Sequence, residues 1–464
     1  MVLIAPRPDP DLRARSAEGF RRLCEWAAQA ARAPLPEDAR RRAALILADD
    51  IGAAVAASGE PEVVAARALE TTHGPQEASV FSAGAPRLDR VSAAVANGMA
   101  ATWAELDEGY RLAPCHAGAY IWPALVAEAQ ASGASVDATL SALAVAYDMT
   151  ARLARAFPFP AMTVHPHAAF ATFGAAAGVA LLRGLDAGTL LSATSGAASM
   201  AFAGPYGHAI EGALVRNAWT AAGAWIGFRS VGWAQAGVGG LPETAYDVFA
   251  ISFGAGCEPD QLDQDLGARW SVAEGYHKVF ACCQYAHSML EASLDLHGRL
   301  GPGACDAVDA IEIETHPRGL TLTAVEPPTV LSAKFSMPHA AAAAARLGVG
   351  GQAAFTRATL DDPSIAALRR RVTLKPLAEV EPWPNDRAAR LAWIMKDGTR
   401  HEAHRLNARG GADQPFDEAT LRAKLAENTD PTFPEMARTL WRLLDSANAR
   451  APLAALLAAA VGEA

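Results

Sequence analysis

The sequence predicts a mainly α-helical protein, with a large all-α helical domain and a smaller α+β domain that contains an antiparallel sheet. The first half of the chain is a succession of alanine- and leucine-rich segments with helical periodicity. Alternation at the strand period begins only near residue 307. With 464 residues, the chain also exceeds the roughly 250–300 residues at which one hydrophobic core stops growing.

The helices of the large domain are expected to follow one another at short intervals. An apolar stripe that starts after Pro36 predicts the first helix, and Ser58-Gly59 ends it. Similar patterns predict helices at 60–72, 87–104, 119–132, 135–155, 167–183, 186–200, 212–236, 417–427 and 433–461. We therefore predict that residues 1–265 and 411–464 together form the all-α domain.

The intervening residues, 266–410, carry the strand signals. Residues 307–315 alternate apolar and acidic side chains, and 390–405 contain two candidate strands around Asp397-Gly398, a dipeptide typical of hairpins. Helical patterns at 336–347 and 363–371 lie between them. We predict a lid-like α+β domain over 266–410.

Composition argues against several classes of protein. The formal charge of −10, from 40 basic and 50 acidic residues, gives no electrostatic footprint for nucleic acid. The uncharged stretches 157–182 and 187–210 are interrupted by Gly, Pro, Ser and His, which favours buried helices over membrane spans. Only four apolar residues open the chain, so no signal peptide is expected. The six cysteines form no CxxC pair, which favours a reduced, cytoplasmic setting without structural zinc.

Four segments concentrate ionisable side chains among small or apolar neighbours. They are 104–120 with Glu105, Asp107, Tyr110 and His116, 163–177 with His165, 204–216 with His208 and Arg216, and 274–287 with Lys278 and Tyr285. Each has an ordinary structural interpretation: an acidic helix end, a capping histidine, a tight turn and a lysine at a domain border. The chemical alternatives are an imidazole acting as acid or base, an anion cradle of glycines and arginine, and a lysine whose pKa is lowered by desolvation.

Taken together, these segments resemble the MmgE/PrpD family, which includes 2-methylcitrate dehydratase, cis-aconitate decarboxylase and iminodisuccinate epimerase. Five motifs in order carry the resemblance: ILADDIGAAVAAS at 46–58, AAVANGMAATWAELDE at 93–108, HPHAAFATFGAAAG at 165–178, YHKVFACCQYAHSMLEA at 276–292 and AKFSMPHAAAAA at 333–344. The resemblance implies an all-α domain built from both ends of the chain, a smaller α+β domain, a homodimer, and an enzyme that requires neither cofactor nor metal.

The same resemblance assigns roles to individual residues. It implies that His116, His165 and Lys278 are catalytic and that the acidic segment with Glu105 and Asp107 belongs to the site. We expect Asp107 to be catalytic as well, and Glu105, Tyr110, Arg216, His208 and Tyr285 to contact substrate. Arg216 stands where family members carry a lysine, which keeps a cation but removes a titratable group. Tyr110 lies in a loop that lacks the hydroxyl residue several members place before the histidine.

The chemistry implied by the family moves a proton on the carbon α to a carboxylate. One of His116 and His165 would abstract the proton, while the other would protonate the leaving hydroxyl or return a proton. Loss of water, epimerisation and decarboxylation share this first step. We expect a hydro-lyase acting on a small di- or tricarboxylate, with an epimerase or decarboxylase as the alternative. The non-enzymatic alternative is a degenerate, anion-binding dimeric scaffold.

Overall fold

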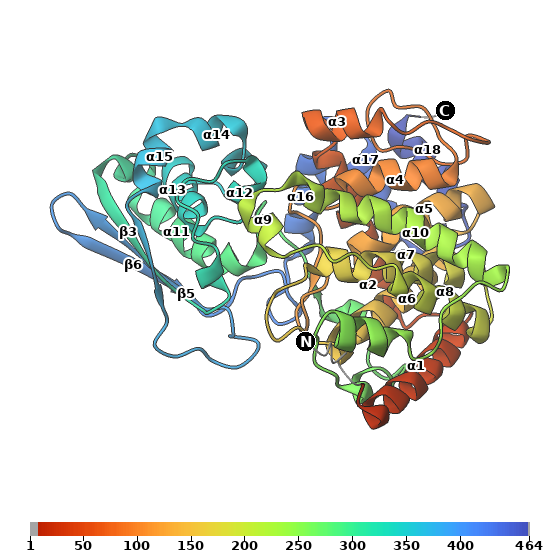
Figure 1. The fold of residues 1–464 in the computed structure, drawn as a ribbon. Coiled ribbons are helices and arrows are strands. Elements are labelled where there is room, and N and C mark those ends of the chain that lie inside the picture. Colours follow the sequence, from red (N-terminus) through yellow and green to blue (C-terminus); the bar gives the residue numbers. More distant parts are fainter. Residues whose placement is uncertain (1–7, 463–464) are drawn as a thin grey trace.

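The computed structural model, which describes residues 8–462, consists of a large helical lobe and a smaller lobe with a sheet (Figure 1). The large lobe contains α1 Pro10–Ala30, α2 Glu37–Ala56, α3 Pro61–Arg67, α4 Arg90–Ala100, α5 Ala117–Ser132, α6 Val136–Ala156, α7 Pro166–Leu182, α8 Ala187–Ser199 and α10 Ala218–Gln235. The C-terminal helices α16 Glu418–Thr429, α17 Met436–Trp441 and α18 Leu453–Val461 return to this lobe, where α16 packs on α2 and α18 on α5. The fold class expected from the sequence is confirmed.

Small residues allow the central helices to approach closely. The helices α7 and α10 pack against each other, and a Cβ atom at Gly223 would lie 2.7 Å from Cβ of Ala171. A Cβ atom at Gly227 would likewise lie 2.5 Å from Cβ of Ala175. The uncharged segment around α7 is therefore a buried core helix, as expected. Among residues 8–462, no helix combines the length and apolar character needed to cross a membrane.

The smaller lobe places helices on one side of a four-stranded sheet. It contains α11 His287–Leu300, β3 Val308–Thr315, α12 Val330–Lys334, α13 Met337–Leu347, α14 Arg357–Asp361, α15 Pro363–Arg369, β4 Val372–Pro376, β5 Ala389–Met395 and β6 Arg400–Arg405. The strand order is β4-β3-β5-β6, and the predicted hairpin is formed by β5 and β6, with Gly398 at φ 84°. Strand β4 pairs parallel to β3, so the sheet is mixed rather than wholly antiparallel. The parallel pairing is possible because the helices α12–α15 form a crossover between these two strands.

A second, two-stranded ladder brings two distant segments to the lobe boundary. Strand β1, Gly109–Tyr110, pairs antiparallel with β2, Gly275–Tyr276. It joins the acidic loop before His116 to the segment that carries Lys278. Although β2 lies within 266–410, its partner strand belongs to the large lobe. The domain boundaries at residues 265 and 410 stay a prediction.

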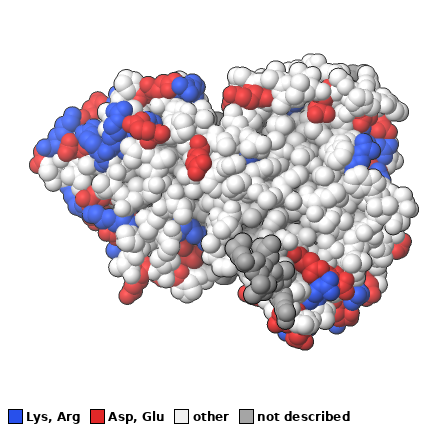
Figure 2. All heavy atoms as spheres, in the orientation of Figure 1, with Lys and Arg blue, Asp and Glu red and all other residues white. Residues whose placement is uncertain are grey.

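Several elements differ from the sequence expectations. Helices α1 and α11 were not predicted. The pattern over 433–461 is divided into α17 and α18 by two short 3₁₀ turns and a segment that contains Pro452. The pattern over 60–72 gives a helix only as far as Arg67. In the view of Figure 2, charged side chains gather on the small lobe and at the end of the large lobe near α1, while much of the large lobe is uncharged.

Candidate active site

A pocket of about 50 Å³ lies where the two lobes meet, and residues of both lobes line it. Seven of the nine predicted site residues are among the lining residues: Glu105, Tyr110, His116, His165, Arg216, Lys278 and Tyr285. Asp107 lies behind this lining and contacts two of its members. His208 does not line the pocket; its ring stacks on Trp219, which in turn contacts His165.

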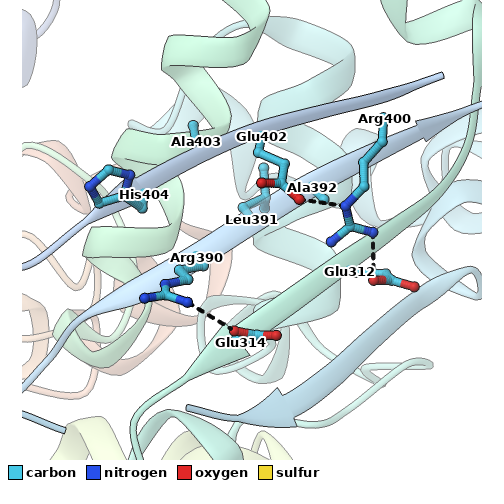
Figure 3. Close-up of a pocket in the computed structure, with 9 residues that line it drawn as sticks. All are labelled: Glu312, Glu314, Arg390, Leu391, Ala392, Arg400, Glu402, Ala403 and His404. Carbon is cyan, nitrogen blue, oxygen red and sulfur yellow. Dashed lines mark hydrogen bonds and ion pairs between the residues drawn. The ribbon is translucent and has the colours of Figure 1, made fainter. Parts of the chain in front are cut away.

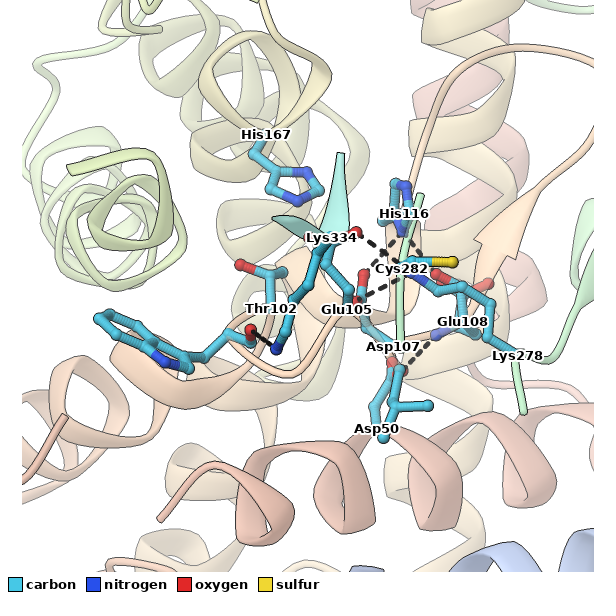
Figure 4. A network of polar contacts seen from close by, with 12 residues as sticks. Asp50, Thr102, Glu105, Asp107, Glu108, His116, His167, Lys278, Cys282 and Lys334 are labelled. Carbon is cyan, nitrogen blue, oxygen red and sulfur yellow. Dashed lines mark hydrogen bonds and ion pairs between the residues drawn. The ribbon is translucent and has the colours of Figure 1, made fainter. Parts of the chain in front are cut away.

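The acidic loop 102–108 is held in place by side chains from three different elements. Arg216 donates to the carbonyl of Thr102, Lys334 to that of Trp103 and Lys424 to that of Leu106, at 2.8–2.9 Å. Within the loop, Glu105 adopts φ 57°, a left-handed conformation that residues other than glycine rarely occupy. These bonds fix a short non-helical backbone from which the carboxylates of Glu105 and Asp107 approach the ammonium of Lys278 (Figure 4).

Two cations and two carboxylates form a buried cluster at the base of the pocket. Arg216, in the 3₁₀ turn Leu214–Asn217, lies 2.5 Å from Glu105. The ammonium of Lys278 lies 3.6 Å from Glu105 and 3.4 Å from Asp107. All four side chains are at most 3% exposed, so each charge depends on its partners for compensation.

This cluster decides the protonation state of Lys278. Burial alone would lower the pKa of Lys278, but Asp107 and Glu105 outweigh it and raise the pKa above its ordinary value. Burial likewise opposes ionisation of Asp107, and the charges of Lys278 and His116 hold its pKa below the ordinary range. The lowered lysine pKa expected from desolvation is therefore wrong, because the two carboxylates were not counted as neighbours. Lys278 is a cation suited to binding an anion.

His116 stands at the N-terminus of α5 with one ring nitrogen facing acceptors. Its Nδ1 lies 2.7 Å from the carbonyl of Glu108 and 2.7 Å from Oδ2 of Asp107. Both neighbours accept hydrogen bonds, so the neutral ring carries its proton on Nδ1. The Nε2 atom then holds a lone pair, on a ring that lines the pocket and is 18% exposed. This geometry suits a general base.

His165 has the opposite arrangement at the N-cap of α7. The backbone N–H of His167 donates to its Nδ1 at 3.1 Å, and Nε–H of Arg216 is directed at its Nε2 at 3.5 Å. Donors thus face both ring nitrogens, and a neutral imidazole can accept at only one of them. The shorter contact decides the tautomer: Nδ1 accepts, and the proton is on Nε2. Burial, reinforced by the charge of Arg216, lowers the pKa of His165 well below its ordinary value. His165 is thus a neutral hydrogen-bond donor.

A third histidine, His167, was not predicted as a site residue. Its ring lies between those of His116 and His165, with centroid distances of 5.0 and 4.4 Å. Tyr120 contacts its Nδ1 at 2.8 Å, and its buried Nε2 has no hydrogen-bond partner among the described residues. The HPH motif at 165–167 was the available signal. No group of three or more potential metal ligands occurs within residues 8–462.

Two of the predicted substrate contacts are tyrosines with different surroundings. The hydroxyl of Tyr110 donates to Glu274 at 2.9 Å, and burial raises its pKa. Tyr285 carries the guanidinium groups of Arg387 and Arg318 over its ring, at 5.0 and 5.9 Å from the centroid. The pocket is also lined by residues for which the sequence motifs indicated no function: Tyr206, Tyr276, Gln284, Phe335 and Arg387.

Beneath His116, two buried carboxyl groups face the start of α5. The backbone N–H of Glu108 donates to Asp50, while Glu108 accepts from Gly118 N–H at 2.7 Å and from the Tyr147 hydroxyl at 2.8 Å. Burial raises the pKa of Glu108 to about 8 and, with the neighbouring carboxyl of Glu108, raises that of Asp50. Glu108 is therefore largely protonated at neutral pH, which limits repulsion in the acidic loop.

A larger cavity of about 360 Å³ lies on the sheet of the small lobe (Figure 3). Its charged side chains compensate one another across strands: Arg400 lies 2.8 Å from Glu312, and Arg390 lies 4.0 Å from Glu314. Exposed pairs of this kind contribute little and leave no charge for a ligand. The pocket between the lobes is the stronger candidate.

Comparison with known proteins adds to this geometry. Residues 21–254 match the family model of the MmgE/PrpD N-terminal domain, and residues 280–447 match that of the MmgE/PrpD C-terminal domain. The chain is 25% identical over 296 residues to the cis-aconitate decarboxylase of Aspergillus terreus, covering 60% of each protein. It is 26% identical over 289 residues to the cis-aconitate decarboxylase-like protein oryM of Aspergillus oryzae, covering 58% of this chain. The matches span 60% of the length of each relative.

Proposed function

The chain belongs to the MmgE/PrpD family, and from that premise we propose that it is an enzyme acting on a di- or tricarboxylate through a proton on the carbon α to a carboxylate. One observation carries the proposal. Two histidines with opposite hydrogen-bonding roles, His116 and His165, line the same pocket as the buried cations Lys278 and Arg216. A base, a neutral donor and cations are what α-proton abstraction requires.

In the proposed reaction, Nε2 of His116 takes the α-proton. The developing negative charge on the substrate carboxylate is stabilised by Nε2–H of His165 and by the ammonium of Lys278. Asp107, 2.7 Å from Nδ1 of His116, holds the ring in the tautomer that leaves Nε2 free and stabilises the imidazolium that forms. Arg216 keeps Glu105 and the loop carbonyl of Thr102 in position.

We propose a hydro-lyase as the outcome of this step. The bond between the β-carbon and its hydroxyl oxygen breaks, the electron pair of the α-carbanion forms the double bond, and the hydroxide leaves as water with a proton from a pocket donor. The ammonium of Lys278 presents such a donor and is left as the neutral amine, while Nε2–H of His165 contributes a hydrogen bond. The products are one unsaturated acid and one water molecule.

A decarboxylase is the second candidate, and the two relatives named above favour it. Decarboxylation would use the same cations to bind the acid and the same histidines to move a proton at the α-carbon. Epimerisation, in which the proton returns to the opposite face, also needs only a base and a donor.

The volume of the pocket indicates how substrate reaches it. About 50 Å³ is far below the roughly 300 Å³ at the lower end of ligand pockets. Because residues of both lobes line the pocket, movement of the small lobe away from the large one would enlarge it. We propose that the lobes separate to admit substrate and close over it.

The test is an NMR screen of di- and tricarboxylates with the purified chain in deuterated water. Loss of an α-proton signal reports proton abstraction, and new vinylic or decarboxylated products identify the outcome. We expect exchange with at least one acid and none with the His116→Gln variant. A wild-type chain that neither exchanges nor converts any acid in the panel would refute the proposal.

The homodimer implied by the family is part of the same proposal. Trp225 and Trp233 on α10 are 40% and 41% exposed, and much of the large lobe in Figure 2 carries no charge. Exposed tryptophans are typical of subunit interfaces, as is arginine, and Arg229 lies over the Trp225 ring at 5.3 Å from its centroid. Light scattering should give twice the mass of the 48.3 kDa chain, and a monomer would contradict it.

A further inference from the structure

Arg387 brings a cation into the pocket from the small lobe. It belongs to the segment between β4 and β5, is 3% exposed, and lines the pocket together with Gln284 and Tyr285. Its Nη1 donates to Oε1 of Gln284, and its guanidinium lies 5.0 Å from the centre of the Tyr285 ring. Its buried Nε has no hydrogen-bond partner among residues 8–462.

The charges around the pocket leave Arg387 without full compensation. The cations Arg216 and Lys278 face the carboxylates of Glu105 and Asp107. The carboxylate nearest to Arg387 is that of Asp386, 3.7 Å away, but Asp386 also pairs with Arg111 at 2.7 Å. Two arginines thus share one carboxylate. A buried guanidinium with a free donor is costly, so a position of this kind is explained by an anion that arrives with a ligand.

We propose that Arg387, flanked by Gln284 and Tyr285, is a subsite for a second carboxylate of the substrate, one that does not take part in the proton transfer. This inference rests on the proposed function and names the residue that selects di- and tricarboxylates over monocarboxylates. The planar guanidinium matches a carboxylate in two-point geometry, and the Tyr285 ring limits its rotation.

The subsite is assembled only when the two lobes are together. Arg111, next to β1 in the large lobe, donates to the carbonyl of Pro384 at 3.0 Å and to Asp386 at 2.7 Å. These two bonds hold the segment that carries Arg387 against the loop that leads to His116. Arg111 and Asp386 are therefore positioning residues for Arg387, and the second carboxylate of the substrate helps to keep the lobes closed.

The experiment is calorimetric titration of the full-length chain with propane-1,2,3-tricarboxylate, an acid that lacks a leaving hydroxyl. We expect Arg387→Gln to weaken binding about 10- to 100-fold, because the substrate carboxylate loses a charged hydrogen-bonding partner. Arg387→Lys keeps the charge without the planar fork and should bind with intermediate affinity. Butyrate, with one carboxylate, should bind the wild type and Arg387→Gln equally weakly. Arg390→Gln, at an exposed arginine three residues away, is the matched control and should bind as the wild type does.

Each result decides between clear alternatives. Equal affinity of wild type and Arg387→Gln for the tricarboxylate would overturn the subsite, and so would a wild type that does not bind the acid. If Arg387→Gln does not fold, as judged by circular dichroism, the Arg387→Lys comparison decides in the same way. Binding needs no turnover: a wild type that binds through Arg387 but converts no acid refutes the proposed function and leaves the subsite standing.

Discussion

Oδ2 of Asp107 lies 2.7 Å from Nδ1 of His116, and the carboxylate that makes this contact is fully buried. The other oxygen of Asp107 lies 3.4 Å from the ammonium of Lys278. One side chain therefore acts with the carbonyl of Glu108 on the tautomer of the proposed base and also anchors the proposed anion-binding cation. The two groups must keep a fixed separation, because a single rigid carboxylate connects them.

Asp107→Asn should abolish most activity while preserving the shape of the site. The amide can present an N–H to Nδ1 of His116, which favours the tautomer with the proton on Nε2 and removes the free base. By analogy with a carboxylate that orients a catalytic histidine, we expect kcat to fall by about 10²- to 10⁴-fold. The rate of α-proton exchange measures it. Asp309→Asn, at a 59% exposed position of the small lobe, should leave the rate unchanged.

The two pocket histidines should respond differently to the same substitution. His116→Gln removes the base and should eliminate α-proton exchange, a loss of about 10²- to 10⁴-fold. His165→Gln replaces an Nε2–H donor by an amide N–H donor and should reduce the rate by less. Exchange rates of both variants, measured in deuterated water at several pH values, separate the roles. A greater loss in His165→Gln would reverse the assignment.

Local sequence signals were sufficient to predict most of the helical lobe and to locate the four segments that line the pocket. Pro166 at the first turn of α7 and the small-residue pattern after it predicted both the helix and His165 at its N-cap. Arg387 had no such signal, because it lies in a loop and reaches the pocket only through contacts with Arg111 across the lobe boundary. The parallel pairing of β4 with β3 could not be predicted from the sequence either, because it depends on how the helices between these strands pack.

Electrostatics within the site were the part least accessible from sequence. Burial of Lys278 was predicted, but the direction of its pKa depends on two carboxylates whose side chains only the folded loop brings within 4 Å. The direction of the His208 side chain likewise depends on the folded structure. Its segment was chosen correctly, since Tyr206 and Arg216 line the pocket, but the short helix at Gly207–Glu211 turns His208 toward Trp219.

The Glu108 carboxyl should make stability fall as the pH rises. Burial raises its pKa to about 8 from the ordinary 4.5, so the folded chain keeps a proton that the unfolded chain loses between these values. Its contribution is fully present below pH 4.5 and is lost as the pH rises toward 8. We expect Glu108→Gln to remove most of this dependence, on the order of 4–5 kcal/mol between pH 4.5 and 8.

Urea denaturation of the wild type and of Glu108→Gln across this pH range tests the prediction. The glutamine can still accept from Gly118 N–H and can donate to Tyr147, so the variant should fold. Glu435→Gln, at a 60% exposed position, is the control and should keep the pH dependence of the wild type. Parallel curves for wild type and Glu108→Gln would show that Glu108 is ionised in the folded chain.

Gly118→Ala tests how tightly α5 must approach α2 for His116 to be in place. Alanine is favoured over glycine in a helix by about 1 kcal/mol, so propensity alone predicts a more stable chain. A Cβ atom at this position, however, would lie 2.4 Å from Oδ2 of Asp50 and 2.7 Å from Cγ2 of Ile46. Asp50 cannot swing away freely, because its other oxygen accepts from Glu108 N–H.

The steric cost at Gly118 should therefore exceed the gain in helix propensity. Overpacking of a buried site costs about 1–3 kcal/mol, so we expect a net loss of stability in chemical denaturation. Because His116 precedes Gly118 by two residues, the shift of α5 that relieves the clash also moves the ring away from Asp107, and activity should fall more than stability alone explains. Gly59→Ala, where nothing lies within 4 Å, should be neutral in both measurements. A Gly118→Ala variant that is stabilised and fully active would mean that α5 can shift without displacing His116.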